Sequence, residues 1–360
     1  MKRSTQLPLW TIGAPVLAVA ILLAAMFGIM GGSTIVVLAA LGLGGSVFAA
    51  VHHAEVIADR VGEPLGTLVL ALAVTLIEVA LIVSLMTAGG EEAAGLARDT
   101  VFAAVMIILN GIVGLCLLVG GLKHREQNFS LDGATAALVA LATIVILTLV
   151  FPNYTVTTPG PYYSPSQLAL IAVVTLVVYG AFVFTQTFGH RQFFLQDDAG
   201  TSSPTTPPGK GATALSSVLL LVCLVVVVLL AKKLAPSLEA AVTGMGAPNA
   251  LVGVIIAGIV LLPEGVAAVR AAIANRLQTS LNLALGSALA TIGLTIPAVS
   301  FVSLYTDSHL RLGLDAKSSL LLMLSLFLSV LVLRTGRTII LHGIVLLTLF
   351  VVYLFTTVVP

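Results

Sequence analysis

Long apolar stretches recur along almost the whole of this sequence, and each is long enough to cross a lipid bilayer. A hydrocarbon core of about 30 Å is spanned by about 20 apolar residues in helical conformation. The stretches are continuous and lack the alternation of membrane β-barrel strands. Only 9% of the residues are charged, and the mean hydropathy is +1.15. The sequence therefore predicts an all-α polytopic membrane protein.

We expect eleven transmembrane helices. The first follows a short charged head but is too long for a signal peptide, and a second apolar run comes directly after it, so we interpret it as a retained helix. The expected spans are residues 7–30, 34–51, 65–88, 99–121, 133–151, 166–188, 214–231, 247–269, 280–305, 318–333 and 338–358. Both cysteines, Cys116 and Cys223, lie inside such stretches, which implies no disulfide framework.

The distribution of Lys and Arg predicts the orientation, because cytoplasmic loops carry an excess of both. With the N-terminus inside, eleven of the 16 Lys and Arg residues lie on the cytoplasmic side and five outside. The loop at residues 152–165 contains neither type, as an external loop should. We therefore expect a multi-pass protein of the cell's inner (plasma) membrane, surrounded by lipid, with a cytoplasmic N-terminus.

Two glutamates lie deep inside apolar stretches, at matching positions. Residues 65–83 and 251–269 can be aligned with six identities, and Glu78 and Glu264 are each the fourteenth residue of their stretch. A carboxylate at bilayer depth is unfavourable by a few kcal/mol or more, so such residues generally mark a functional site. A buried structural pair is the alternative, although packing alone does not explain the duplication.

The expected topology makes these two stretches antiparallel copies. The stretch with Glu78 runs outward as the third helix, and the stretch with Glu264 runs inward as the eighth. Inverted-topology repeats with an ion site near the midplane are typical of secondary transporters. We divide the chain into a first helix (1–33), a first inverted repeat (34–190, five helices), a cytoplasmic linker rich in Pro, Gly, Ser and Thr (191–213) and a second inverted repeat (214–360, five helices).

Neutral oxygen atoms accompany both acids. Thr75 lies one turn before Glu78, and Pro263 directly precedes Glu264, where a broken helix could offer carbonyl oxygens to a cation. The helices that follow the acids carry Asn110, and Asn282 with Ser287. Helix packing for the proline, and interhelical hydrogen bonding for the amides and hydroxyls, are the alternatives.

Two carboxylates with neutral oxygens suit a hard cation. Ca²⁺ takes six to eight oxygen ligands from carboxylates, carbonyls, amides and water. The same carboxylates can bind protons, and burial favours their protonated form, so protons and cation can compete. Glu78 and Glu264 are therefore expected to bind the transported metal ion and protons in turn, which is the mechanism of an antiporter.

Two blocks of the sequence resemble a known family. Residues 62–86 with 97–121, and residues 261–299, are similar to the two repeats of ChaA-type calcium/proton antiporters of the calcium/cation antiporter superfamily. In that superfamily one acid in each repeat binds the cation, which the resemblance transfers to Glu78 and Glu264. The usual Gly-Asn ahead of the first acid is replaced by Val74 and Thr75. Members of this type exchange Ca²⁺, Na⁺ or K⁺ for protons, and the resemblance does not choose among them.

A second polar cluster lies where the second helix leaves the membrane. His52, Glu55 and Asp59 share a face at helical spacing, next to His53 and Glu63. Because histidine titrates near physiological pH, the first three could form a proton-sensing cytoplasmic gate. A solvated loop is the alternative interpretation.

Other classes of function fit the sequence less well. It contains no GxSxG or HExxH motif of an enzyme and no P-loop of an ATP-driven pump. We expect no enzymatic activity, no cofactor and no nucleic-acid partner. The favoured function is exchange of Ca²⁺ for protons by alternating access. A Na⁺ or K⁺/proton antiporter of the same fold is the first alternative, and a passive cation channel, in which the acids form a filter, is the second.

Overall fold

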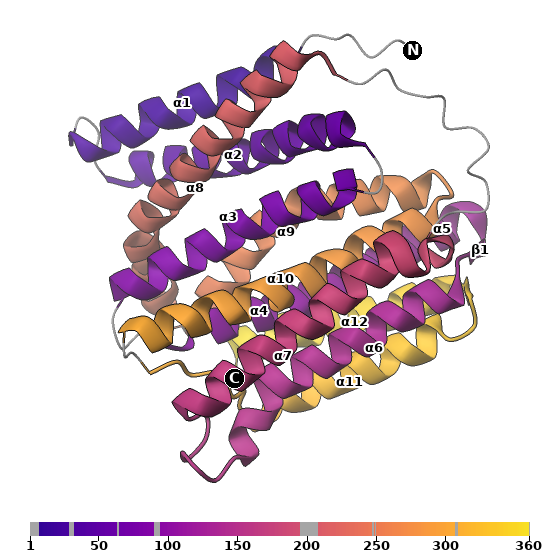
Figure 1. Ribbon diagram of the computed structural model, residues 1–360. Coiled ribbons are helices and arrows are strands. Elements are labelled where there is room, and N and C mark those ends of the chain that lie inside the picture. Colours follow the sequence, from indigo (N-terminus) through magenta and orange to yellow (C-terminus); the bar gives the residue numbers. More distant parts are fainter. Residues whose placement is uncertain are drawn as a thin grey trace. The chain divides into compact units, whose positions relative to one another are not determined.

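The computed structural model describes residues 7–28, 32–62, 65–89, 94–194, 208–246, 248, 250–306 and 309–359. Within them, each expected span contains a helix (Figure 1). Ten helical segments of the described chain are long and apolar enough to cross a membrane. An eleventh apolar helix, Leu72–Met86, lies within α3 (Leu65–Gly89). The predicted all-α membrane architecture is confirmed.

Two helices extend well beyond their expected ends. α2 (Gly32–Val61) continues ten residues past the apolar stretch, so the polar cluster at His52 is helical and does not form a loop. Neither Gly nor Pro interrupts residues 52–61, and Gly62, with φ of +78°, follows the last helical residue. α8 (Lys210–Gly244) likewise continues through Lys232, Lys233 and Pro236. The end of an apolar stretch indicates where the chain leaves the membrane. The helix itself can continue into water until a residue such as glycine ends it.

The chain divides into two compact units, each of which combines parts of both halves of the sequence. The first unit comprises Met1–Ala88 and Ser202–Gly246, and the second comprises Gly89–Thr201 and Ala247–Pro360.

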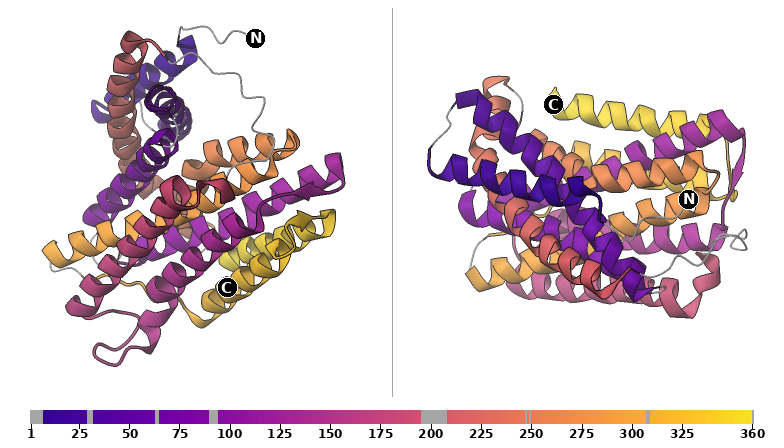
Figure 2. Two further views of the ribbon diagram at one scale, coloured as in Figure 1. Left: turned by 45° about the vertical axis from the view of Figure 1, so that its right-hand side comes forward. Right: turned by 90° about the horizontal axis from the view of Figure 1, so that it is seen from above.

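In the first unit, α1 (Leu9–Met26), α2 and α8 pack against one another (Figure 2). Gly42 of α2 lies where the three helices converge. A Cβ atom there would lie 3.3 Å from Ile21 Cδ1 of α1 and 3.5 Å from Leu230 Cδ1 of α8. Small residues at such points let membrane helices approach closely, and close van der Waals packing is the main attraction between helices in lipid.

A buried histidine also joins these three helices. His53 of α2 has its Nε2 3.0 Å from the Thr11 carbonyl oxygen of α1 and its Nδ1 3.2 Å from Ser216 Oγ of α8. A carbonyl only accepts, so Nε2 carries the proton and Nδ1 accepts from the serine hydroxyl. The Thr11 carbonyl lacks its usual helical partner, because residue 15, four positions on, is proline. His53 thus supplies the donor that Pro15 removes.

We expect His53→Leu to lower the free energy of unfolding by about 2 kcal/mol, because a buried carbonyl and a buried hydroxyl then lose their partners. In a Pro15→Ala background the loss should be smaller, since the backbone of α1 regains an N–H for Thr11. Thermal unfolding of the four variants in detergent measures both values. Equal losses in the two backgrounds would contradict this role of His53.

The second unit is built around two helical rods. One is continuous from Leu96 to His124 and consists of α4 (Leu96–Met106), the π-helical turn η2 (Ile107–Ile112) and α5 (Val113–His124). The other is α10 (Leu277–Thr306), which contacts α4, η2 and α5. These rods are the most deeply buried of the long apolar helices in the described chain. Asn110 lies on the first rod and Ser287 on the second, and both rods contact α9, which carries Glu264.

Other helices surround these rods. They are α6 (Leu131–Val145) with η3 (Ile146–Val150) and η4 (Phe151–Tyr154), α7 (Pro165–Phe184) with η5 (Thr185–Gly189) and η6 (Arg191–Phe193), α9 (Ala250–Ile273), α11 (Ala316–Leu333) and α12 (Ile340–Val358). Two short strands, β1 (Gln127–Asn128) and β2 (Arg337–Thr338), pair antiparallel between the α5–α6 and α11–α12 connections. The sequence did not predict this pairing.

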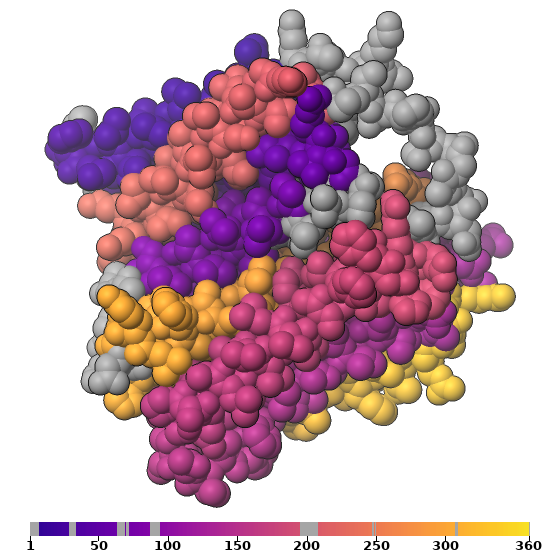
Figure 3. All heavy atoms as spheres, in the orientation of Figure 1, coloured from indigo at the N-terminus to yellow at the C-terminus, as the bar shows by residue number. Residues whose placement is uncertain are grey.

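The outer helices present large apolar side chains. On α7, which forms part of the visible surface of the second unit in Figure 3, Leu170, Val177 and Phe184 are exposed at seven-residue spacing. Leu320 and Phe327 repeat the pattern on α11. Contiguous apolar stripes of this kind are unusual on a water-soluble monomer and suit contact with lipid chains.

The expected linker is helical at both described ends. Arg191–Phe193 forms the 3₁₀ turn η6, and α8 already begins at Lys210. Residues 195–207 lie outside the described residues.

Candidate cation-binding site

Glu264 lies on α9 and accepts a hydrogen bond from the Ser287 hydroxyl of α10 through Oε2. Both side chains are half-buried in the second unit. The structure thus brings together two residues that the sequence separates by 23 positions. A carboxylate with a neighbouring hydroxyl offers one charged and one neutral oxygen ligand to a cation.

α9 is held against the α4–η2–α5 rod at two levels by close glycine contacts. At Gly253, a Cβ atom would lie 3.1 Å from the Thr100 backbone nitrogen. At Gly265, next to Glu264, it would lie 3.3 Å from Ile112 Cδ1. A side chain at Gly253 would force the helix away from backbone atoms. Glu264 therefore lies on a helix whose distance from the rod is fixed by packing.

Side chains at the end of α5 anchor the C-terminal end of α9. Lys123 Nζ and His124 Nε2 lie 3.1 and 2.9 Å from the Ile273 carbonyl oxygen. Gln127 Nε2 donates to the Ala272 carbonyl at 3.0 Å. The last carbonyls of a helix have no partner within it, and the Lys123 and His124 side chains supply partners to the Ile273 carbonyl. The Ala272 carbonyl also accepts from the Asn275 backbone N–H. His124 was not expected to have a role from the sequence, and its partner lies 149 positions away in the chain.

Pro263 does not break α9, which runs continuously from Ala250 to Ile273. The expectation of a broken helix at this point is therefore wrong. The proline still lacks an N–H, so the Ile259 carbonyl four residues earlier has no donor at that position of the helix.

The Ser287 hydroxyl can bond to either protonation state of Glu264. It donates to the carboxylate, as observed. Its oxygen can instead accept a hydrogen bond from the O–H of the carboxylic acid, since a hydroxyl has one donor and two acceptor positions. The pair can therefore gain or lose a proton without breaking its contact.

We expect Ser287→Ala to raise the apparent KM for the cation about ten-fold, because a hydrogen bond to a charged group contributes about 1.5 kcal/mol or more. Proton movement at increasing cation concentration in proteoliposomes gives this value. Ser300→Ala is the control, since Ser300 lies on the same helix and its buried hydroxyl has no partner among the described residues. An unchanged KM in Ser287→Ala would remove Ser287 from the site.

In the first unit, Glu78 and Thr75 lie on α3 and are 3% exposed each. They are three residues apart, so they share one face of the helix. A glutamate this deeply buried needs a charged or hydrogen-bonding partner, or a proton. The burial of Glu78 agrees with its position deep inside an apolar stretch of the sequence.

Asn110 is fully buried in η2. Its Nδ2 donates to Ser325 Oγ of α11 at 2.9 Å. Single π-helical turns inside α-helices occur frequently at functional sites. The sequence places Asn110 on a helix but gives no indication of the π-turn or of Ser325.

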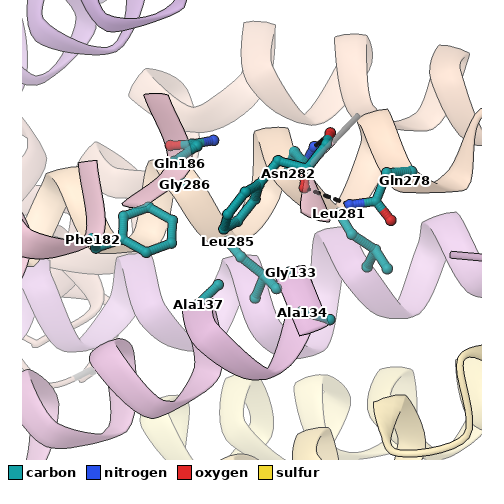
Figure 4. A pocket seen from close by; sticks show the side chains of 11 residues that line it. Gly133, Ala134, Ala137, Phe182, Gln186, Gln278, Leu281, Asn282, Leu285 and Gly286 are labelled. Atoms are coloured by element: carbon teal, nitrogen blue, oxygen red, sulfur yellow. Dashed lines mark hydrogen bonds between the residues drawn. The ribbon is translucent and has the colours of Figure 1, made fainter. Parts of the chain in front are cut away.

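Asn282 lies in a different cluster from Ser287, although both are on α10. Its Nδ2 donates to the Phe194 carbonyl at 2.6 Å, and its Oδ1 accepts from Gln278 at 2.9 Å (Figure 4). Asn282 also lines a small pocket of about 10 Å³, which has room for about one water molecule. The rest of the lining comes from α6, α7, η5, α10 and Phe194. Five residues along a helix correspond to about 140° of rotation, so Asn282 and Ser287 cannot share a face.

The expected gate residues lie at the far end of α2. His52 Nδ1 is 3.8 Å from Glu55 Oε2, and the His52 ring is 5.6 Å from the ring of Trp10 on α1. Asp59 is exposed one turn beyond Glu55, and Glu63 lies outside the described residues. Among the described residues, no three His, Cys, Asp or Glu side chains come together as a metal site.

Comparison with known proteins identifies the family. The sequence model of the sodium/calcium exchanger protein family matches residues 31–188 and 215–359. The chain belongs to this family. Each matched segment of this exchanger-family chain contains one of the two acids. The resemblance to the calcium/cation antiporter superfamily is thereby confirmed, and the chain is a multi-pass membrane protein of a transporter family.

Two relatives of this exchanger-family chain cover most of it. The y4hA protein of Sinorhizobium fredii is 46% identical over 99% of this chain and 98% of its own length. The sodium-potassium/proton antiporter ChaA of Escherichia coli is 37% identical over 89% of this chain and 87% of its own length.

Solved structures share the fold of the exchanger-family chain. Native YfkE has a TM-score of 0.73 at 18% identity, covering 96% of this chain and 99% of that chain. The H⁺/Ca²⁺ exchanger CAX has a TM-score of 0.70 at 16% identity, covering 96% and 87%. The predicted fold class, two inverted-topology repeats after a first helix, is that of these exchangers.

Proposed function

We propose that this protein is a secondary active transporter that exchanges a cation for protons by alternating access. The observation that carries the proposal is the Glu264–Ser287 pair inside the membrane-spanning helices α9 and α10 of a chain from an exchanger family. Glu264 binds the cation as a carboxylate and releases it when protonated. Ser287 remains bonded to it in both states.

Glu78 is proposed as the corresponding acid of the first repeat, with Thr75 as its neighbouring hydroxyl. The two residues are buried on α3, at the position that matches Glu264 in the sequence. Asn110 is proposed as a neutral ligand, because its amide is buried in the core of the second unit. We do not include Asn282, since both groups of its amide are bonded elsewhere.

Ca²⁺ is the first candidate cation, because two carboxylates balance its charge and oxygen ligands suit it. The CAX structure, which shares the fold, is that of an H⁺/Ca²⁺ exchanger. Na⁺ or K⁺ is the second candidate, favoured by the 37% identical relative that is a sodium-potassium/proton antiporter. In either case we propose an inner-membrane location with a cytoplasmic N-terminus, and a cytoplasmic gate at His52, Glu55 and Asp59.

The proposal is tested with purified protein in liposomes that contain a pH-sensitive dye. Ca²⁺, Na⁺ or K⁺ is added outside in separate experiments, with the membrane potential held at zero. Cation uptake coupled to proton export should make the interior alkaline. Protein-free liposomes give the background.

Alkalinisation with Ca²⁺ supports the first candidate, and alkalinisation with Na⁺ or K⁺ alone supports the second. Cation uptake without proton movement would instead indicate a channel. No response to any of the three cations would contradict cation/proton exchange.

A further inference from the structure

The amide of Asn110 is held in one orientation by a neighbouring serine. Its Nδ2 lies 2.9 Å from Ser325 Oγ, and Ser325 Oγ donates its own proton to the Leu321 carbonyl at 2.8 Å. A serine hydroxyl has one proton, so the oxygen is left to act as an acceptor toward Asn110. In this arrangement the NH₂ side of the amide faces that acceptor.

Met106 reinforces this orientation. Its sulfur lies 3.7 Å from Asn110 Nδ2, one turn earlier on the same rod. A thioether is a weak acceptor and has no proton to donate. An inverted amide would place Oδ1 against the sulfur, which has no proton to donate to it. The contacts around Nδ2 therefore fix the direction of the whole side chain.

The consequence is an unpaired oxygen inside the protein. Asn110 is fully buried, and its Oδ1 has no hydrogen-bond partner among the described residues. Buried acceptors are nearly always satisfied, and an exception calls for a water, an ion or a functional role. The oxygen belongs to a π-helical turn, a feature that concentrates at functional sites.

This turn lies beside the helices that carry the candidate site. η2 contacts α9 and α10, which carry Glu264 and Ser287, and it also contacts α11, which carries Ser325. All of these groups belong to the second unit. A neutral oxygen held unpaired on this turn is suited to a cation or to a water molecule of its hydration shell.

We propose that Ser325 is a positioning residue for cation transport, which keeps the Asn110 amide oriented so that Oδ1 stays available to the cation or its water. The inference rests on the proposed exchange function. Ser325 itself contributes no ligand, because its oxygen and its proton are both engaged.

The test measures proton movement against cation concentration in proteoliposomes, using the cation to which the wild type responds. Ser325→Ala should raise the apparent KM about five-fold, the effect of losing one hydrogen bond that orders a ligand, and should leave kcat nearly unchanged. The matched control is Ser329→Ala, one turn further along α11. Ser329 is also buried, its hydroxyl has no partner among the described residues, and its replacement should leave KM unchanged.

The decisive comparison is with Asn110→Ala. If Ser325 acts only through Asn110, adding Ser325→Ala to Asn110→Ala should change KM no further. Full additivity of the two effects, or an unchanged KM in Ser325→Ala, would overturn the inference while leaving the exchange function intact. Absence of exchange by the wild type would refute the proposed function itself, which is a separate result.

Discussion

Replacing Glu264 with glutamine should reduce cation-driven proton movement at least about a hundred-fold, corresponding to about 3 kcal/mol. Glutamine has nearly the same size, and its amide oxygen can still accept the hydrogen bond from Ser287. It has no charge to attract a cation and no proton to exchange. The substitution therefore isolates the ionisable group from the shape of the side chain.

Initial rates in the liposome assay measure this effect, with equal amounts of inserted protein. Glu239→Gln is the matched control, because Glu239 is an exposed glutamate near the end of α8 and should tolerate the change. Glu78→Gln should match Glu264→Gln if the two acids act in one transport cycle. Cation-coupled proton movement that persists in Glu264→Gln would refute the role of this acid.

Gly343→Ala should lower the stability of the second unit by about 3 kcal/mol, because α12 touches α5 at this position through backbone atoms. A Cβ atom on Gly343 would lie 2.4 Å from the Leu118 backbone nitrogen and 2.7 Å from the Gly114 carbonyl oxygen. No flexible side chain can move aside to make room. The two helices would have to separate, and the neighbouring contacts around Gly114 would loosen with them.

Thermal unfolding followed with a thiol-reactive dye suits this comparison. Cys116 and Cys223 are free and buried, so their thiols become reactive when the protein unfolds. We expect a midpoint lower by about 5 to 10 °C in Gly343→Ala. Gly180→Ala on α7 serves as the control, because among the described residues no atom outside the local helix backbone lies within 4 Å of its added Cβ. A midpoint equal to that of the wild type would contradict the prediction, because α12 could then move away from α5 without loss of stability.

The helices could be predicted from the sequence because each depends on local properties. A stretch of about 20 apolar residues is sufficient for a span, whatever its neighbours are. All eleven spans were found in this way, and the two acids stood out because their stretches align. The ends of α2 and α8 were misplaced, since the loss of apolar character was taken as the end of the helix.

The partners of the polar side chains could not be predicted in the same way. Asn282 and Ser287 were grouped because they are close in sequence, but the turn of the helix directs one to Phe194 and the other to Glu264. His53 was noted as part of a polar cluster, whereas it serves the carbonyl that Pro15 leaves without a donor. The proline four residues after Thr11 indicates in the sequence that the Thr11 carbonyl lacks a donor within the helix.

The membrane class, the eleven helices, the repeat with its two acids and the family could all be predicted before the structure was known. These follow from hydropathy and from matched motifs, which are properties of continuous segments. Only the tertiary structure decided that Ser287 bonds to Glu264, that Ser325 orients Asn110 and that Gly343 meets the backbone of α5. In lipid, helices associate through close packing and interhelical hydrogen bonds, so the partner of each polar group depends on which helices can approach closely.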